Sequence, residues 1–169
     1  MGSAKASLLM TKEDLVTFFH SDLFIPDLDA LCKGDPGKDA VIRAMVSHLA
    51  QRKRFRNEKI VLETLRMREK LGSTGIGKGV AIPHGRSSVS KELTLMFARS
   101  PEGVDFDAVD GKPVHLFFMI LAPHVDKESL YLPLLGKIVE VTKDATARRR
   151  LMKALGFEEV TEVLLKAER

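Results

Sequence analysis

The chain has 169 residues, the size of one domain, and a chain this long buries about 70% of its unfolded surface without needing a metal or a disulfide. Apolar residues make up 44% of the sequence and the net charge is only +4, which excludes a mainly disordered chain. The single cysteine, Cys32, excludes a disulfide framework and favours a reducing compartment.

The first nine residues are predicted to be a flexible N-terminus, and residues 10–169 a single domain. No apolar run approaches the ~20 residues of a membrane helix, and the N-terminus does not resemble a secretory signal, so a cytoplasmic protein is expected. Residues 11–14 resemble a capping box that starts a short helix. Its apolar side is formed by Leu15, Phe18 and Phe19.

A brief strand is expected over residues 23–28, and Pro26 favours an edge position for it. Residues 34–37 have the composition of a turn. The spacing of apolar residues then predicts helices over residues 38–53 and 57–71. The first helix has one buried stripe, formed by Val41, Ala44, Met45, His48 and Leu49.

Strands are predicted over residues 80–82, 93–98 and 113–121, with a short strand or turn at 103–107. The segment 113–121 is almost continuously apolar, which favours a central strand. Three helices follow, over residues 127–141, 144–155 and 158–166, the second capped by Asp144 and ended by Gly156. Helices and strands occur mostly in runs, which predicts an α+β domain with a mixed sheet.

A glycine-rich segment, residues 72–79, separates the second helix from the first of these strands. Gly72 to Lys78 fits the first seven positions of a nucleotide-binding P-loop, but Gly79 replaces the required Ser or Thr and the preceding segment is helical in pattern, which argues against a nucleoside triphosphatase. The segment could still form a nest of backbone N–H groups for an anion. A tight connection whose glycines only permit unusual backbone angles is the other interpretation.

His84 lies next to this segment, between Pro83 and Gly85 at the end of a strand. A neutral imidazole is a good nucleophile near pH 7, and a phosphorylated one carries a new dianion that needs donors around it. Candidate donors are the hydroxyls of Ser73 and Thr74, the amides of Gly75, Ile76 and Gly77, and the guanidinium groups of Arg68 and Arg86. A structural histidine with one hydrogen bond is the alternative.

Two blocks of sequence now resemble a known family. Residues 68–85 read Arg-Glu-Lys-Leu-Gly-Ser-Thr-Gly-Ile-Gly-Lys-Gly-Val-Ala-Ile-Pro-His-Gly, and residues 104–116 form a second block. Both resemble type-2 enzyme IIA domains of the bacterial phosphotransferase system, in the fructose, mannitol and nitrogen-regulatory group. The resemblance extends over about residues 10–167.

The resemblance implies a cytoplasmic phosphoryl carrier with a three-layer α/β/α sandwich fold. His84 matches the active histidine, which accepts phosphate at Nε2 from an HPr-like phosphocarrier protein, and Arg68 matches an active-site arginine. No metal or nucleotide cofactor is implied, because the phosphate arrives already activated from phosphoenolpyruvate.

One position departs from the family pattern. The family usually has a second histidine at the start of the helix after the central strand, and Tyr131 stands there. A tyrosine can donate a hydrogen bond to a phosphate oxygen but cannot become a cation. His124, seven residues earlier, is an alternative if its loop folds back.

Three functions remain open. A stand-alone nitrogen-regulatory protein acting on regulatory targets is favoured, since the sequence contains no permease segment. A fructose- or mannitol-type subunit that serves a membrane permease component is the second, and a non-phosphorylated interaction module is the third. Basic residues are mixed with acidic ones along most of the chain, and the two densest basic clusters, at residues 52–56 and 148–150, lie in helical patterns, so nucleic-acid binding is not expected. Membrane insertion is not expected either, since no apolar run is long enough.

Overall fold

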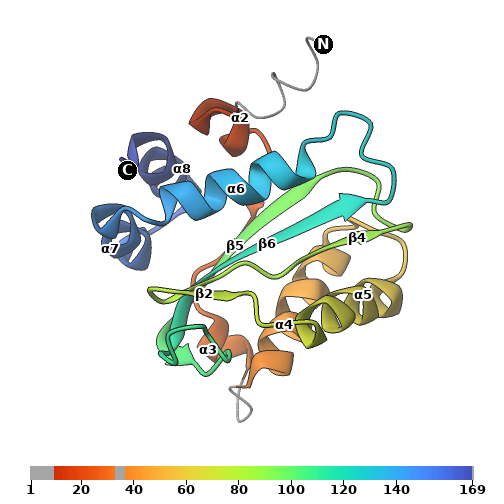
Figure 1. Ribbon diagram of the computed structural model, residues 1–169, viewed down its shortest axis with the longest axis horizontal. Coiled ribbons are helices and arrows are strands. Elements are labelled where there is room, and N and C mark those ends of the chain that lie inside the picture. The colour runs from red at the N-terminus through yellow and green to blue at the C-terminus, as the bar shows by residue number, and fades with distance from the viewer. Residues whose placement is uncertain (1–9, 33–36, 169) are drawn as a thin grey trace.

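The computed structural model describes residues 10–32 and 37–168, and a mixed sheet of six strands lies at the centre of this part of the chain (Figure 1). The sheet order is β1-β5-β6-β3-β2, with β4 pairing with β6 beyond β3. β6 runs antiparallel to β5 and parallel to β3 and β4, which confirms the mixed sheet and the central position predicted for this strand. The strands are β1 (Phe19–Ile25), β2 (Gly75–Gly77), β3 (Val80–Ala81), β4 (His84–Ser87), β5 (Thr94–Val104) and β6 (Val114–Pro123).

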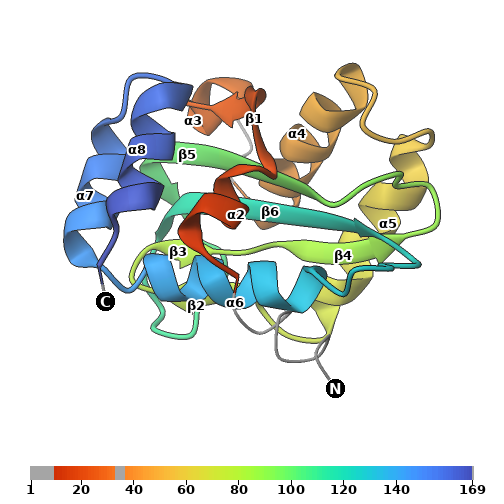
Figure 2. The same cartoon turned by 90° about the horizontal axis from the view of Figure 1, so that it is seen from above.

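Helices cover both faces of the sheet, which gives the α/β/α sandwich (Figures 1 and 2). One face carries α3 (Leu28–Leu31), α4 (Lys38–Gln51) and α5 (Glu58–Lys70). The other carries α2 (Lys12–Val16), α6 (Tyr131–Val141), α7 (Ala145–Lys153) and α8 (Phe157–Lys166). Among the described residues, no helix is long and apolar enough to cross a bilayer.

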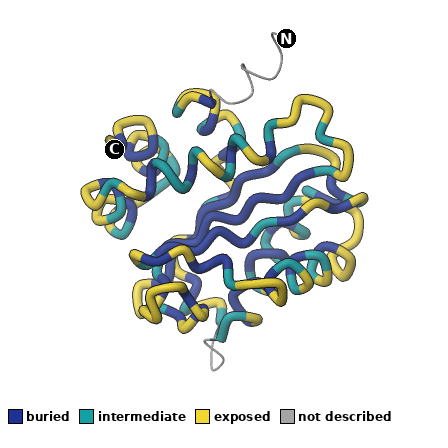
Figure 3. The backbone as a smooth tube through the Cα atoms, in the orientation of Figure 1, coloured by how far each residue is buried: buried dark blue, intermediate teal, exposed yellow. Residues whose placement is uncertain are grey.

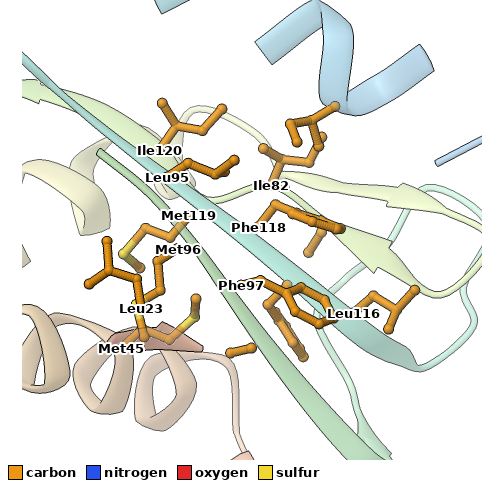
Figure 4. Packing of buried hydrophobic residues seen from close by; sticks show 14 of the residues in the cluster. Leu23, Met45, Ile82, Leu95, Met96, Phe97, Leu116, Phe118, Met119 and Ile120 are labelled. Atoms are coloured by element: carbon orange, nitrogen blue, oxygen red, sulfur yellow. The ribbon is translucent and has the colours of Figure 1, made fainter. Parts of the chain in front are cut away.

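The core lies on both faces of the sheet because successive strand residues point to opposite sides. Figure 3 shows the central strands buried along most of their length. In Figure 4, Met96 and Met119 pack with Met45 of α4, while Phe118 and Ile120 lie on the opposite face, toward α6. Paired residues on β5 and β6 share a face, as the register Met96↔Met119 requires. A strand buried on both faces explains the continuous apolar run in β6.

Two predicted helices differ in their boundaries. α6 begins at Tyr131 instead of residue 127, because Ser129 has a left-handed backbone (φ 53°) and the Asp126 carboxylate accepts a hydrogen bond from the Tyr131 amide at 2.8 Å. The first helix ends at Val16, and Phe19, expected on its apolar side, instead opens β1. The capping box at Thr11 is present.

Three other boundaries also differ from the predictions. α7 ends at Lys153, and Gly156 is the N-cap of α8, not the C-terminal stop of α7. β5 continues to Val104 through Pro101, where its pairing with β6 is irregular and a residue without an N–H is tolerated. Leu28 belongs to α3. The flexible N-terminus predicted over residues 1–9 and most of the turn at 34–37 lie outside the described residues.

Candidate functional site

The candidate site lies where the chain running beside β6 is interrupted. β3 pairs with the first half of β6, and β4 resumes the pairing at His84, opposite Ile120. Pro83 in the gap contributes its carbonyl oxygen, which accepts a hydrogen bond from Ile120 N at 3.0 Å. A Cβ at Gly85 would lie 3.1 Å from Thr64 Cγ2, so the strand runs close to α5 at this position. The interruption places the imidazole within reach of Arg68 of α5 and Tyr131 of α6.

The hydrogen bonds of His84 define its tautomer. Its Nδ1 lies 2.6 Å from the carbonyl oxygen of Ile82, and a carbonyl can only accept, so Nδ1 carries the proton. Nε2 is then the unprotonated nitrogen, and it accepts a hydrogen bond from Arg68 Nε at 3.2 Å. Another nitrogen of Arg68 donates to Gly72 O at 2.9 Å, which fixes the guanidinium against the loop. The lone pair of Nε2 is thus directed toward a cation.

The surroundings of His84 keep it neutral. Burial lowers the pKa of His84 below 6.5, and the charge of Arg68 lowers it further. The hydrogen bond to the Ile82 carbonyl and the charge of Glu69 act in the opposite direction without reversing the shift. At neutral pH the imidazole therefore retains the lone pair that a nucleophile requires.

Tyr131 and Arg86 complete the immediate surroundings of the imidazole. The Tyr131 ring at the start of α6 lies 6.0 Å from the His84 ring, centroid to centroid, at an angle of 54°. Arg86 of β4 places its guanidinium carbon 4.8 Å from the centroid of the Tyr131 ring. Burial raises the pKa of Tyr131, so its hydroxyl stays protonated and can donate. His124 is exposed in the loop before α6, and the residue with its ring against His84 is Tyr131.

The two hydroxyls of the glycine-rich segment are directed at protein acceptors. Ser73 Oγ donates to Phe106 O at 2.7 Å and accepts from Gly75 N at 3.0 Å. Thr74 Oγ1 donates to Glu69 Oε2 at 2.7 Å. A Cβ at Gly75 would lie 2.8 Å from Ala108 Cα, so this glycine permits a close backbone approach. These bonds hold the loop in place, and the binding of phosphate by Ser73, Thr74 and the amides of 75–77 stays a prediction.

Glu69 is a site residue that the sequence analysis did not single out. Its carboxylate is 9% exposed, accepts from the Thr74 amide at 2.8 Å, and pairs with Lys38 Nζ at 2.8 Å. The Thr74 carbonyl in turn accepts from the amide of Ile82, whose carbonyl orients His84. A signal was present, since Val61, Leu65 and Glu69 follow the four-residue spacing of one helix face. A carboxylate at that third position indicates a buried, paired charge.

The described residues therefore bring together His84, Arg68, Arg86 and Tyr131 from α5, β4 and α6 (Figure 2). In the same part of the chain, no group of three or more His, Cys, Asp or Glu side chains is placed to hold a metal ion. The arrangement offers one nucleophilic nitrogen, two cations and one hydroxyl. Such a set suits the transfer of a phosphoryl group to nitrogen.

Comparison with known proteins identifies the family to which this chain belongs. The model of the EIIA 2 component of the phosphoenolpyruvate-dependent sugar phosphotransferase system matches residues 18–167. The chain belongs to this family, and it is accordingly a component of a phosphotransferase system.

Individual relatives come from two branches of that family. The chain is 38% identical over 127 residues to the nitrogen regulatory protein of Klebsiella oxytoca, covering 73% of this chain and 76% of that protein. It is 34% identical over 127 residues to the fructose-specific EIIA component of Haloferax volcanii, covering 75% and 82%. The structure of nitrogen regulatory protein IIA-Ntr from Neisseria meningitidis superposes with a TM-score of 0.77 at 35% identity, covering 88% of this chain and 97% of that one.

Proposed function

We propose that the protein is a histidine phosphocarrier in which Nε2 of His84 accepts a phosphoryl group from an HPr-like phosphocarrier protein. The observation that carries this proposal is the 2.6 Å contact between His84 Nδ1 and Ile82 O, which reserves the proton for Nδ1 and the lone pair for Nε2. A bond forms between Nε2 and phosphorus while the nitrogen–phosphorus bond of the donor breaks. The donor imidazole leaves, and the proton stays on His84 Nδ1, hydrogen-bonded to Ile82 O.

Side chains around His84 can bind the negatively charged phosphoryl group. A phosphoryl group carries up to about two negative charges and three acceptor oxygens. Arg68 donates to Nε2 in the resting state and would turn this donor to a phosphoryl oxygen. Arg86, two residues further along β4, and Tyr131 of α6 are the other side chains that would bind the phosphoryl oxygens. We assign Ser73 and Thr74 to holding the loop, since their hydroxyls already donate within the protein.

An exposed apolar stripe beside the site supports a protein as the phosphoryl donor. Ile60, Met67 and Leu71 are 42%, 64% and 86% exposed and recur at helical spacing along α5 and its end. Thr64, which touches Gly85, and Arg68, which touches His84, lie on the same stretch of helix. Apolar side chains gathered next to a reactive group are typical of a docking surface. An HPr-like carrier would bind here without entering a deep cavity.

A nitrogen-regulatory role in the cytoplasm is favoured by the 38% and 35% identities to nitrogen regulatory proteins. Phosphorylation would then change which regulatory targets can dock, because it adds negative charge next to the stripe on α5. A sugar-transport subunit that serves a membrane permease component is the second candidate, and the fructose-specific relative favours it. In either case residues 10–169 would act as one domain.

The test is phosphoryl transfer from phosphoenolpyruvate, with enzyme I and HPr-like carriers of both branches supplied separately. Intact mass is measured for the wild type, for His84→Ala, and for His124→Ala as the matched control on an exposed histidine. We expect one phosphoryl group on the wild type and on His124→Ala, and none on His84→Ala. The faster carrier distinguishes the nitrogen-regulatory branch from the sugar branch.

Two results would contradict the proposal. Uptake that persists in His84→Ala would place the phosphoryl group on another residue. The absence of uptake from either carrier, with the wild type folded, would favour an interaction module that binds partners without phosphorylation.

A further inference from the structure

A cavity is lined by residues of α7, of the start of β6 and of the turn that joins β2 to β3. These elements lie at the opposite end of the sheet from β4 (Figure 2). The cavity volume is about 150 Å³. Its lining consists of apolar carbon from Gly79, Leu116 and Met152, the imidazole of His115, and the positively charged side chains of Lys78, Arg148 and Arg149. The lining residues and the residues that contact His84 form separate sets.

The turn that borders this cavity is rigidly placed. Lys78 and Gly79 have φ values of 57° and 76°, and two successive positive φ values define the tight turn of a two-residue β-hairpin. The amides of His115 and Leu116 both lie 2.9 Å from the carbonyl oxygen of Gly79. Asp110 Oδ2 accepts a hydrogen bond from the amide of Lys78 at 3.0 Å. The cavity is therefore preformed and does not depend on a flexible loop.

Within the part of the chain that the structure describes, the cations at its border form no ion pair with a carboxylate. Among the described residues, the ion pairs engage other cations, including Lys38, Arg54 and Arg66, but not Lys78, Arg148 or Arg149. Arg148 Nη1 donates to two carbonyls at the end of α6, and Arg149 Nη2 donates to the Thr146 hydroxyl, and all three acceptors are uncharged.

The carboxylate of Asp110, which contacts the hairpin, is engaged by backbone amides. Asp110 accepts hydrogen bonds from the backbone amides of Lys78 and Lys112, at 3.0 and 3.1 Å. Among the described residues, Lys78 and Arg149 thus border an apolar cavity without an ion-paired carboxylate, while Asp144 lies close enough to Arg148 for the charge of Arg148 to lower the Asp144 pKa. An exposed concentration of one sign of charge attracts a partner of the opposite sign.

We propose that this cavity docks an acidic segment of a partner protein, with one aliphatic side chain inside it and flanking carboxylates on Lys78, Arg148 and Arg149. An apolar cavity of ~150 Å³ is large enough for a benzene-sized group, and the flexible Met152 can adapt to the side chain that enters. Guanidinium groups pair with carboxylates through two parallel hydrogen bonds. Nucleic acid fits less well, because the described lining has no Phe, Tyr or Trp, and its one ring, that of His115, is held by a hydrogen bond to Ser100 O and lies against Gly103.

The probe is the peptide acetyl-Glu-Glu-Leu-Glu-Glu-amide, titrated into the ¹⁵N-labelled full chain, with the same peptide carrying Gly in place of Leu as the control. We expect chemical-shift changes centred on Lys78, Gly79 and Arg149, and about tenfold tighter binding of the leucine peptide, from burial of its side chain. Binding should weaken as salt rises. Shifts centred on His84, or equal binding of the two peptides, would overturn the proposal.

Variants separate specific docking from general attraction of charge. Arg149→Glu should reduce the affinity at least tenfold, while Arg150→Glu, an exposed neighbour on α7 that does not line the cavity, should reduce it much less. Met152→Phe should fill the cavity and remove the preference for leucine over glycine. Circular dichroism checks that each variant is folded. Equal losses for Arg149→Glu and Arg150→Glu, or tighter binding of a single-stranded RNA of equal charge, would contradict the inference.

Discussion

Two clusters of polar side chains lie against the same apolar sheet, one around His84 and one around Arg99, and they differ in what their donors bind. Arg99 is 8% exposed and donates to three carbonyl oxygens, those of Pro26, Leu151 and Ala154, at 3.1, 2.8 and 2.7 Å. Arg68 instead donates one bond to a carbonyl and another to the lone pair of a nucleophilic nitrogen.

The difference separates a structural cation from one available for chemistry. Around Arg99 the acceptors are backbone groups at the end of α7 and after β1 that would otherwise be buried without partners, so the charge completes the fold. Around His84 a donor is directed at a nitrogen that can acquire a phosphoryl group. The Arg86 guanidinium lies over the aromatic ring of Tyr131. It can leave this ring to bind an anion more readily than Arg99 can leave its buried carbonyl acceptors. We therefore expect substitutions at the two arginine sites to separate stability from activity.

The largest effect on stability is expected for Arg99→Met. Removing the guanidinium leaves three carbonyls without their donor, which should lower the free energy of unfolding by about 3 kcal/mol and the melting temperature by about 6–12 °C. Phosphate uptake, measured well below the melting temperature, should stay close to that of the wild type. Thermal unfolding followed by circular dichroism gives the first quantity. An exposed control, Arg150→Met, should change stability by less than about 0.5 kcal/mol. An unchanged melting temperature in Arg99→Met would mean that water or repacking satisfies these carbonyls.

Arg68→Met should have the opposite profile. We expect the rate of phosphate uptake to fall about 100-fold, equivalent to about 2.7 kcal/mol, because the cation that faces the transferred group is lost. The charge of Arg68 lowers the pKa of His84, so its removal should raise that pKa toward 6.5. Uptake assays and an NMR titration of the His84 ring measure the two effects.

Arg66→Met is the matched control for this substitution, since Arg66 lies on the same helix and pairs with Asp39 instead of the site. It should leave the pKa of His84 and the uptake rate unchanged. A pKa of His84 that stays the same or falls in Arg68→Met would contradict the prediction that the charge of Arg68 lowers it.

Sequence predicted the fold best where apolar periodicity decides it. The helices expected at 38–53 and 57–71 are α4 and α5 to within two residues, and the apolar run at 113–121 is the central strand. Sequence failed where a single side-chain hydrogen bond or one backbone angle sets a boundary. The start of α6 depends on the Asp126 side chain and on the left-handed backbone of Ser129, neither of which an apolar pattern records.

The same contrast applies to the site. His84, Arg68 and Arg86 were found from their residue types and order, whereas Glu69 was overlooked because its role depends on Lys38, a residue 31 positions earlier on another helix. Arg99 was overlooked in the same way, since its acceptors Pro26 and Leu151 are far away in sequence. A charge inside an apolar pattern, as at Glu69 and Arg99, is the local signal that was available in both cases.

The smallest effect on the site is expected for Tyr131→Phe, which removes a hydroxyl but keeps the ring between His84 and Arg86. If the hydroxyl donates to the phosphoryl group, its loss should slow uptake about tenfold, equivalent to about 1.4 kcal/mol. Tyr131→His should instead speed uptake above the wild type, because an imidazole can add a positive charge that a phenol cannot. Rapid-quench measurement of uptake compares the three proteins at one pH. If Tyr131→Phe takes up phosphate as fast as the wild type, the hydroxyl makes no contact in the transfer, and the ring contributes only by holding Arg86 beside the imidazole. Arg86→Met should then slow uptake although Tyr131→Phe does not.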